Sequence, residues 1–285
     1  MRERTVEVAG HGDPIRLAVA EAGEGGRPLL LVHGFTGAKE DFTEWLDPLA
    51  EAGWHAVAPD QRGHGSSDHP ASEEAYSLEI LATDLLGLLD ALGWTSAVVL
   101  GHSMGGMVVQ TAVLRAPERF GGLVLMDTSH RAIAADPAMI ELGVAIARQE
   151  GMASVLAAQD AVDADNPLAN EAYDRLVAQR PDHKAFGDRK LLASSPAMYA
   201  AMLSELTDRS SGVDRLEGLA GLAVPTLVIV GELDGPFRKP SERMAAAIEG
   251  AELVVVPGAG HSPQFEGTDL WWKSLSGFLE QVASA

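Results

Sequence analysis

The 285-residue sequence contains no cysteine. Without a thiol the chain forms no disulfide bond and no thiolate metal site, and it has no cysteine nucleophile. The absence does not indicate a redox compartment. Any nucleophilic catalysis by this chain must therefore use another side chain.

Basic residues are scarce, with 21 Lys and Arg against 41 Asp and Glu and a formal net charge of −20. A strongly acidic surface repels phosphate backbones and anionic lipids, so we expect neither nucleic acid nor a membrane surface as a partner. The sequence also lacks an apolar run of membrane-spanning length, and its first residues lack the apolar segment of a signal peptide. We therefore expect a cytoplasmic protein.

Hydrophobic residues make up 46% of the chain, which is enough for a large core. Apolar strand patterns alternate with helical ones through residues 1–128, and this rhythm returns over 213–285. Such alternation predicts a mostly parallel sheet flanked by helices. Residues 129–212 show helical patterns without a convincing strand, so we expect an inserted helical unit there, with helices after Asp136-Pro137 and near 152–161, 166–179 and 196–206.

One stretch combines a strand, a tight turn and a helix. Residues 97–100 read as a buried strand, and 107–114 carry the apolar face of a helix. Between them, Gly101-His102-Ser103-Met104-Gly105 fits the G-x-S-x-G pattern, in which glycines let the backbone pass closely around a strained serine. This arrangement predicts an exposed, nucleophilic Ser103 hydroxyl.

Two further polar residues follow predicted strands of the same sheet. Asp234 follows 224–230, and His261 follows 253–256. Ligand sites of open α/β sheets lie at the carboxyl ends of the strands, so we expect Ser103, Asp234 and His261 to meet there. A serine hydroxyl needs a base, which His261 supplies, and an acid that orients the imidazole. Asp127, which follows the strand 122–126, is the alternative acid.

Four motifs together resemble the α/β-hydrolase superfamily. They are His33-Gly34-Phe35, Asp60-x-Arg62-Gly63-x-Gly65-x-Ser67, Gly101 to Gly106, and the Asp234/His261 pair. Over its whole length the chain is similar to small bacterial carboxylesterases, lactonases and carbon–carbon hydrolases that use a serine. The resemblance implies an α/β-hydrolase core of residues 1–128 and 213–285 with a cap at 129–212.

The resemblance also implies an oxyanion hole made by the backbone N–H groups of Phe35 and Met104, which lie beside the expected nucleophile. His33 is interpreted as a brace for its loop. Asp60 and Arg62 are interpreted as stabilising a turn, and the His102 side chain is expected to point away from Ser103.

We predict a serine hydrolase that cleaves carboxylic esters of small, mainly apolar molecules through an acyl-enzyme on Ser103. Lactone hydrolysis and carbon–carbon bond hydrolysis use the same three residues and stay open, as does a small-molecule receptor on a hydrolase fold. A serine at 103 disfavours epoxide hydrolase and haloalkane dehalogenase chemistry. Those relatives need a carboxylate there, because water hydrolyses their alkyl-enzyme ester at the carboxylate carbon.

The helical unit is expected to select the substrate, because its methionines suggest an apolar, adaptable pocket. The expected pocket residues are Phe35, His130, Met139, Leu142, Met198 and Met202. No metal is expected, because the histidines lack metal-ligand spacing. No cofactor is expected, because no dinucleotide or phosphate-loop motif occurs. We expect a monomer or a homodimer.

Overall fold

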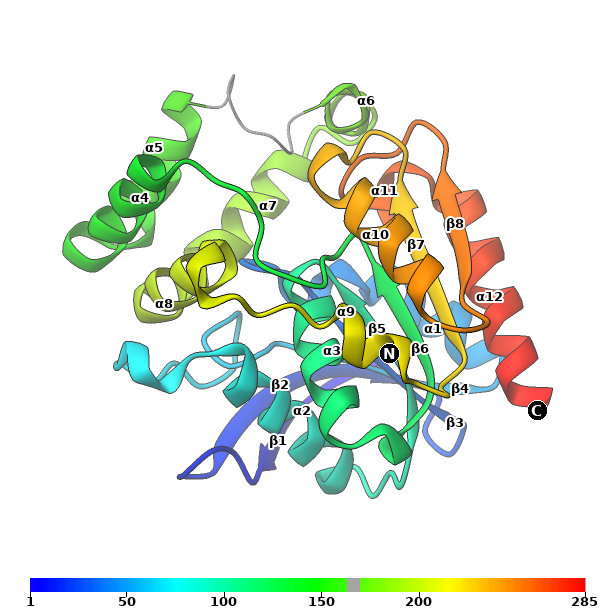
Figure 1. Cartoon of the computed structure of the whole chain (residues 1–285). Helices are drawn as coiled ribbons and strands as arrows, with labels where there is room; N and C mark the ends of the chain where they lie inside the picture. The colour runs from blue at the N-terminus through cyan, green and yellow to red at the C-terminus, as the bar shows by residue number, and fades with distance from the viewer. Residues whose placement is uncertain (163–169, 285) are drawn as a thin grey trace.

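The computed structural model describes residues 1–162 and 170–284 (Figure 1). Its centre is an eight-stranded sheet in the order β1-β2-β4-β3-β5-β6-β7-β8, in which only the β1–β2 and β2–β4 pairs are antiparallel. The predicted α/β-hydrolase fold is confirmed. The strands are β1 (Arg2–Val8), β2 (Ile15–Ala22), β3 (Arg27–Val32), β4 (Trp54–Pro59), β5 (Ala97–His102), β6 (Phe120–Met126), β7 (Thr226–Gly231) and β8 (Glu252–Val256).

Burial along the strands explains their sequences. Every residue of β4, β5 and β7 is buried, because helices cover both faces of the parallel part of the sheet. The edge strand β1 instead buries only Val6 and Val8 and carries exposed charged residues before them. Such charges protect an edge strand from pairing with another chain.

Two helical layers enclose the sheet. On one face, α1 (Thr43–Glu51) and α12 (Thr268–Ser284) contribute large side chains such as Leu46 and Trp271 to one hydrophobic cluster. On the other face, α2 (Leu78–Ala91), α3 (Met104–Arg115) and α10 (Gly235–Ala247) pack into a second cluster. The short helices α9 (Leu216–Ala220) and α11 (Pro263–Glu266) lie on either side of α10 in the chain.

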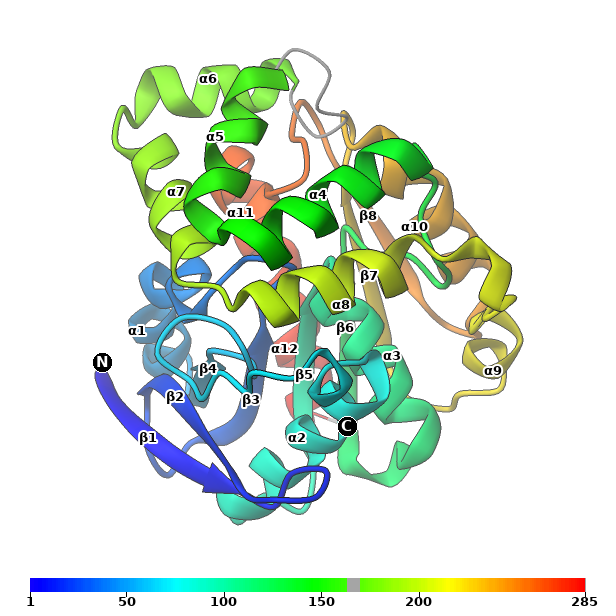
Figure 2. The ribbon, with the colours of Figure 1, turned by 90° about the vertical axis from the view of Figure 1, so that its left-hand side faces the viewer.

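The described part of residues 129–212 forms five α-helices, and Figure 2 shows them gathered above the sheet. The helix expected near 166–179 is described from 171, and its expected start lies outside the described residues. The helix over 183–192 was not predicted, because its sequence mixes charges, a glycine and few apolar residues. The five are α4 (Pro137–Glu150), α5 (Met152–Val162), α6 (Glu171–Gln179), α7 (His183–Leu192) and α8 (Pro196–Thr207).

Polar contacts join the helical unit to the sheet domain. Lys190 of α7 forms an ion pair with the buried Asp41, and Glu205 of α8 accepts a hydrogen bond from the Leu78 N–H. Where the unit begins and ends, Arg131 pairs with Asp214 in an isolated antiparallel bridge. These contacts tie α7, α8 and the two ends of the helical unit to the rest of the chain.

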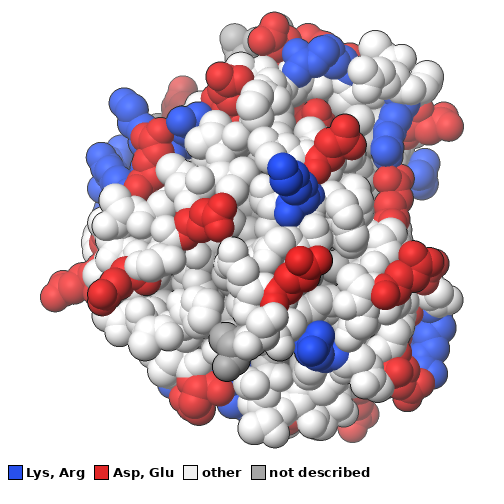
Figure 3. Space-filling view, turned by 90° about the vertical axis from the view of Figure 1, so that its right-hand side faces the viewer, with Lys and Arg blue, Asp and Glu red and all other residues white. Residues whose placement is uncertain are grey.

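Charges of both signs are interspersed on the face shown in Figure 3, and basic side chains form no continuous patch there. Within residues 1–162 and 170–284, no helix has the length and apolar character needed to cross a membrane.

Candidate active site

Ser103 lies at the sharp turn between β5 and α3. Its backbone has φ 54° and ψ −119°, a conformation that L-residues rarely adopt. A Cβ at position 101 would lie 2.6 Å from the Gly105 carbonyl oxygen, and one at 105 would lie 2.4 Å from the carbonyl oxygens of Val32 and His33. Both glycines are therefore required by close backbone contacts, and the turn presents Ser103 at the carboxyl edge of the sheet.

Three side chains form one hydrogen-bonded line at this edge. The Nδ1 atom of His261 lies 2.8 Å from Asp234 Oδ2, and its Nε2 atom lies 3.0 Å from Ser103 Oγ. A carboxylate only accepts, so Nδ1 carries the proton and Nε2 accepts from the serine hydroxyl. Asp234 is buried, whereas Ser103 and His261 are partly accessible. The structure thus brings together the three residues that the sequence singled out.

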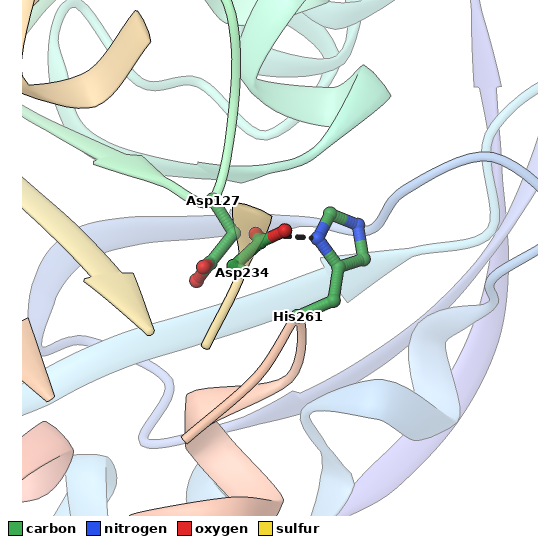
Figure 4. A group of neighbouring side chains, drawn as sticks. All are labelled: Asp127, Asp234 and His261. Atoms are coloured by element: carbon green, nitrogen blue, oxygen red, sulfur yellow. Dashed lines mark hydrogen bonds and ion pairs between the residues drawn. The ribbon is translucent and has the colours of Figure 1, made fainter. Parts of the chain in front are cut away.

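Asp127, the alternative acid, lies on the other side of Asp234 from the imidazole (Figure 4). It follows β6 with φ 44°, is fully buried, and accepts a hydrogen bond of 2.9 Å from the Gly231 N–H through Oδ1. Burial and the neighbouring Asp234 carboxylate raise the pKa of Asp127 well above its ordinary value. Asp234, and not Asp127, is the hydrogen-bonding partner of His261.

Two backbone amides lie beside the serine. Met104 is the first residue of α3, so its N–H has no partner within the helix. The loop of Phe35 is close as well, since a Cβ on Gly34 would lie 3.0 Å from the Ser103 Cβ. Across the described part of the chain, neither the Phe35 nor the Met104 N–H donates to an acceptor. Both amides are free to bind an oxygen atom near Ser103.

Two buried histidines brace the site. Nδ1 of His33 donates to the Gly34 carbonyl oxygen at 2.8 Å, and its Nε2 accepts from the Gln61 N–H at 3.0 Å. His102 donates from Nε2 to the His261 carbonyl oxygen at 2.7 Å. Burial and the nearby His261 lower the pKa of His102 to about 3, so its ring stays neutral at neutral pH.

The turn after β4 is held by buried charges. Asp60 accepts from the backbone N–H and the ammonium group of Lys39, at 2.7 and 3.0 Å. Arg62 forms two hydrogen bonds of 2.7 Å to Asp84. Neither Asp60 nor Arg62 is bonded to Ser103, Asp234 or His261, so their contacts are those of a structural turn.

Sequence reasoning missed two residues that contact the His261 segment. Oε2 of Glu266 accepts hydrogen bonds from the N–H groups of Gly260 and Ser262, at 2.7 and 3.1 Å, on both sides of the histidine. Its signal in the sequence is an acidic residue one helical turn after Ser262, as in a helix cap. The Phe237 ring lies 4.7 Å from the imidazole ring, centroid to centroid. No local pattern indicates that contact.

The expected pocket residues divide into three groups. Met198 and Met202 of α8 are fully buried in the hydrophobic core. Met139 and Leu142 are 47% and 51% exposed, because α4 packs through other residues, such as Val144. Their place in a substrate pocket stays a prediction. His130 is buried at the start of the helical unit, where its Nδ1 lies 2.6 Å from Asp214.

Asp127, Asp234 and His261 are also the one group of three or more His, Asp or Glu residues in 1–162 and 170–284 whose potential metal-ligand atoms lie within 4.8 Å of one another. Both carboxyl groups are buried, and the hydrogen bond between Asp234 and His261 already uses one oxygen and Nδ1. A metal bound there would compete with the bond that orients the imidazole. The geometry therefore fits hydrogen bonding better than coordination.

The architecture is that of an open α/β protein with a polar site at the carboxyl ends of its strands. The family model described as the alpha/beta hydrolase fold matches residues 27–268, and the chain belongs to this family. This confirms the resemblance drawn from the four motifs.

Several proteins that are similar to this chain in sequence or in structure are named as hydrolases. Epoxide hydrolase A of Mycobacterium tuberculosis is 41% identical over 126 residues, which cover 44% of this chain and only 38% of that protein. A thermophilic esterase from Thermogutta terrifontis superposes with a TM-score of 0.82 at 28% identity, over 99% of both chains. The enol-lactonase from Burkholderia xenovorans LB400 has a TM-score of 0.81 at 26% identity, over 96% of this chain and 99% of its own. The fold and these relatives support hydrolase activity.

Proposed function

We propose that this protein is a serine hydrolase that cleaves carboxylic esters of small, mainly apolar molecules. The observation that supports this most directly is the line from Ser103 through His261 to Asp234, with bonds of 3.0 and 2.8 Å. The free Phe35 and Met104 amides beside Ser103 supply the second requirement, a site for the negative oxygen of a tetrahedral intermediate.

The first half of the reaction forms an acyl-enzyme. His261 Nε2 takes the hydroxyl proton of Ser103 as the oxygen attacks the ester carbonyl carbon. Asp234 stabilises the resulting imidazolium through its bond to Nδ1. The two amides bind the oxyanion, and His261 then gives its proton to the departing alcohol as the carbon–oxygen bond breaks.

The second half releases the acid. A water molecule loses a proton to His261 Nε2 and attacks the acyl carbon. The oxyanion forms again between the two amides, and Ser103 leaves with the proton that His261 held. The net reaction is ester plus water to acid plus alcohol, and the three side chains return to their starting protonation states.

Epoxide opening is a poorer fit, although epoxide hydrolases are among the relatives. Attack of a serine oxygen on an epoxide carbon makes an ether, which has no carbonyl carbon for water to attack. Lactone hydrolysis stays a second candidate, because a lactone is a cyclic ester and the enol-lactonase shares the fold over nearly the whole chain.

A panel of p-nitrophenyl esters and lactones of graded chain length, with one aryl epoxide, tests the proposal. We expect steady multiple turnover on at least one ester and none on the epoxide. Faster turnover of lactones than of esters would favour the second candidate. A single burst without further turnover would favour a receptor, and inertness toward the whole panel would contradict the proposal.

We propose that residues 129–212 act as a cap that sets substrate choice. The Tyr199 ring of α8 lies 5.0 Å from the Phe35 ring, centroid to centroid, and Phe35 belongs to the loop beside Ser103. The helical unit thus reaches an aromatic side chain of the site. Tyr199 is nearly fully buried, so its removal opens space against Phe35.

Tyr199→Ala is expected to shift the ratio of kcat/KM between long and short esters by about tenfold or more in favour of long ones, because one methylene in an apolar pocket changes discrimination by that amount. Kinetics on the p-nitrophenyl series measure the ratio, which is independent of the folded fraction. Tyr199→Phe and the exposed Met139→Ala are controls that should leave it unchanged. An unchanged ratio in Tyr199→Ala would show that α8 does not select the chain length.

Glu266→Ala is expected to lower kcat by about 10- to 100-fold with little change in KM, because loss of two hydrogen bonds frees the backbone around His261 and small displacements of a catalytic group have effects of that size. Glu266→Gln should retain most of the activity, since its amide oxygen still accepts from Gly260 and Ser262. Steady-state kinetics of both variants provide the measurement. Equal losses in the two would show that charge, and not loop geometry, is what Glu266 supplies.

A further inference from the structure

We propose that Asp127 is a neutral carboxylic acid in the folded protein and donates its proton in a hydrogen bond to the Asp234 carboxylate. Asp127 is thereby a positioning residue, which acts on His261 through Asp234. The catalytic part of this inference rests on the proposed function, whereas the location of the proton does not.

The two carboxyl groups are neighbours in a buried setting. Figure 4 shows Asp234 between Asp127 and His261, and the potential ligand atoms of the three groups lie within 4.8 Å of one another. Each carboxyl group has one bonded oxygen: Oδ1 of Asp127 accepts from the Gly231 N–H, and Oδ2 of Asp234 faces His261 Nδ1. The other two oxygens, Oδ2 of Asp127 and Oδ1 of Asp234, are buried and receive no hydrogen bond from any residue that the structure describes.

A single proton shared by the two carboxyl groups gives both unpaired oxygens a hydrogen-bonding partner. Two ionised carboxylates have only acceptors, so both remaining oxygens would stay unsatisfied and two like charges would be buried together. A proton on one carboxyl group creates a donor for the other, which lies beside it in the buried site. Neutralising one member of the pair therefore satisfies both groups.

The proton belongs on Asp127 rather than Asp234. Asp234 accepts from the imidazole, and its negative charge is favoured whenever His261 becomes an imidazolium. The charged and titratable groups that face Asp127 are Asp234, Glu266 and His261, and both carboxyl groups raise the pKa of Asp127. Full burial acts in the same direction, since it disfavours the charged form.

A hydrogen bond from Asp127 holds the Asp234 carboxylate in the orientation that meets Nδ1 of His261. Asparagine matches a neutral Asp127 in shape and in polarity. Its amide oxygen accepts from the Gly231 N–H, and its amide nitrogen donates to Asp234. Asparagine does not match an ionised Asp127, because it carries no charge. The Asp127→Asn substitution therefore distinguishes a neutral Asp127 from an ionised one.

The first test compares the unfolding of wild type and Asp127→Asn as a function of pH. If the pKa of Asp127 is raised in the folded state, Asp127 takes up one proton on folding at pH values above the ordinary carboxyl pKa. The stabilisation is complete below the unfolded pKa and is lost as pH rises toward the folded pKa. The ratio of unfolding constants, wild type over variant, should therefore rise about tenfold per pH unit between about pH 5 and 7.

Asp68→Asn is the matched control for this measurement. Hydrogen bonding to Arg16 lowers the pKa of Asp68, so this group is ionised in both states over the same pH range. Its ratio of unfolding constants should stay flat. A flat ratio for Asp127→Asn, or failure of that variant to fold, would overturn the proposal, because the neutral isostere then does not reproduce the native state.

The second test measures kcat on an ester turned over by the wild type. Asp127→Asn should stay within tenfold of wild type, whereas Asp127→Ala should lose about 10- to 100-fold, the range expected for one hydrogen bond to a charged group. KM should change little in either variant. Equal loss in both would overturn the positioning role. A wild type without turnover, but with the expected unfolding ratio, would refute the hydrolase function and leave the shared proton established.

Discussion

Ser103→Ala is expected to lower kcat for ester hydrolysis by about 10⁶, the loss known for removal of a nucleophile from a hydrogen-bonded serine site. The physical reason is that no other group at the turn forms a covalent bond to the acyl carbon. His261 and the free amides remain in place, so substrate binding should persist. Steady-state kinetics and thermal unfolding of the purified variant provide the measurement.

The unfolding transition should stay where it is in the wild type. Alanine meets the same backbone strain as serine at φ 54°, and the deleted hydroxyl bonds only to the partly accessible His261. Ser241→Ala is a suitable control, because Ser241 is fully buried and has no place in the proposed reaction, and its hydroxyl has no hydrogen-bond partner among residues 1–162 and 170–284. A Ser103→Ala variant that keeps a tenth of the wild-type kcat would rule out Ser103 as the nucleophile.

Asp234→Asn is expected to lower kcat by about 10⁴ at neutral pH. The asparagine amide donates to Nδ1, which moves the imidazole proton to Nε2. An Nε2 atom that carries a proton cannot accept one from Ser103, so the attack step loses its base. Kinetics at pH 7 of purified protein with an unchanged unfolding transition measure the loss.

Asp127→Asn is the natural comparison, because it makes the same substitution at the neighbouring carboxyl group, which we propose to be neutral. The expected loss there is tenfold or less, since the imidazole is hydrogen-bonded to Asp234 and Asp127 to the Gly231 N–H. A larger loss at 127 than at 234 would reverse the assignment of the orienting acid, while Ser103 and His261 would keep their proposed roles.

The residues proposed to select the substrate and those proposed to position His261 lie in different parts of the site. The Tyr199–Phe35 contact lies between α8 and the loop beside the serine, whereas Asp127 and Glu266 are hydrogen-bonded to backbone N–H groups of the sheet domain. Substitutions in the first group should change which ester is cleaved. Substitutions in the second should change kcat for all esters alike.

Much of the fold was readable from local sequence. Apolar runs such as 28–32 and 226–230 form strands wherever they are covered on both faces, and residues 97–106 contain their own strand, turn and helix start. The α/β rhythm and its interruption after residue 128 follow from patterns within a few residues of each other. Helix α7 was not predicted because its sequence lacks clear periodicity. Contacts with other segments, such as the ion pair of Lys190 with Asp41, stabilise it instead.

The sequence by itself determined the α/β-hydrolase architecture, Ser103 at the turn, and two acids and a histidine at strand ends. Only the tertiary structure decided which acid faces His261, that Glu266 holds the backbone on both sides of it, and that Met139 and Leu142 lie in solvent. The physical reason is the separation along the chain over which each interaction acts. Strand and turn preferences act between chain neighbours, whereas hydrogen-bonding partners and burial depend on distances between residues that lie far apart along the chain.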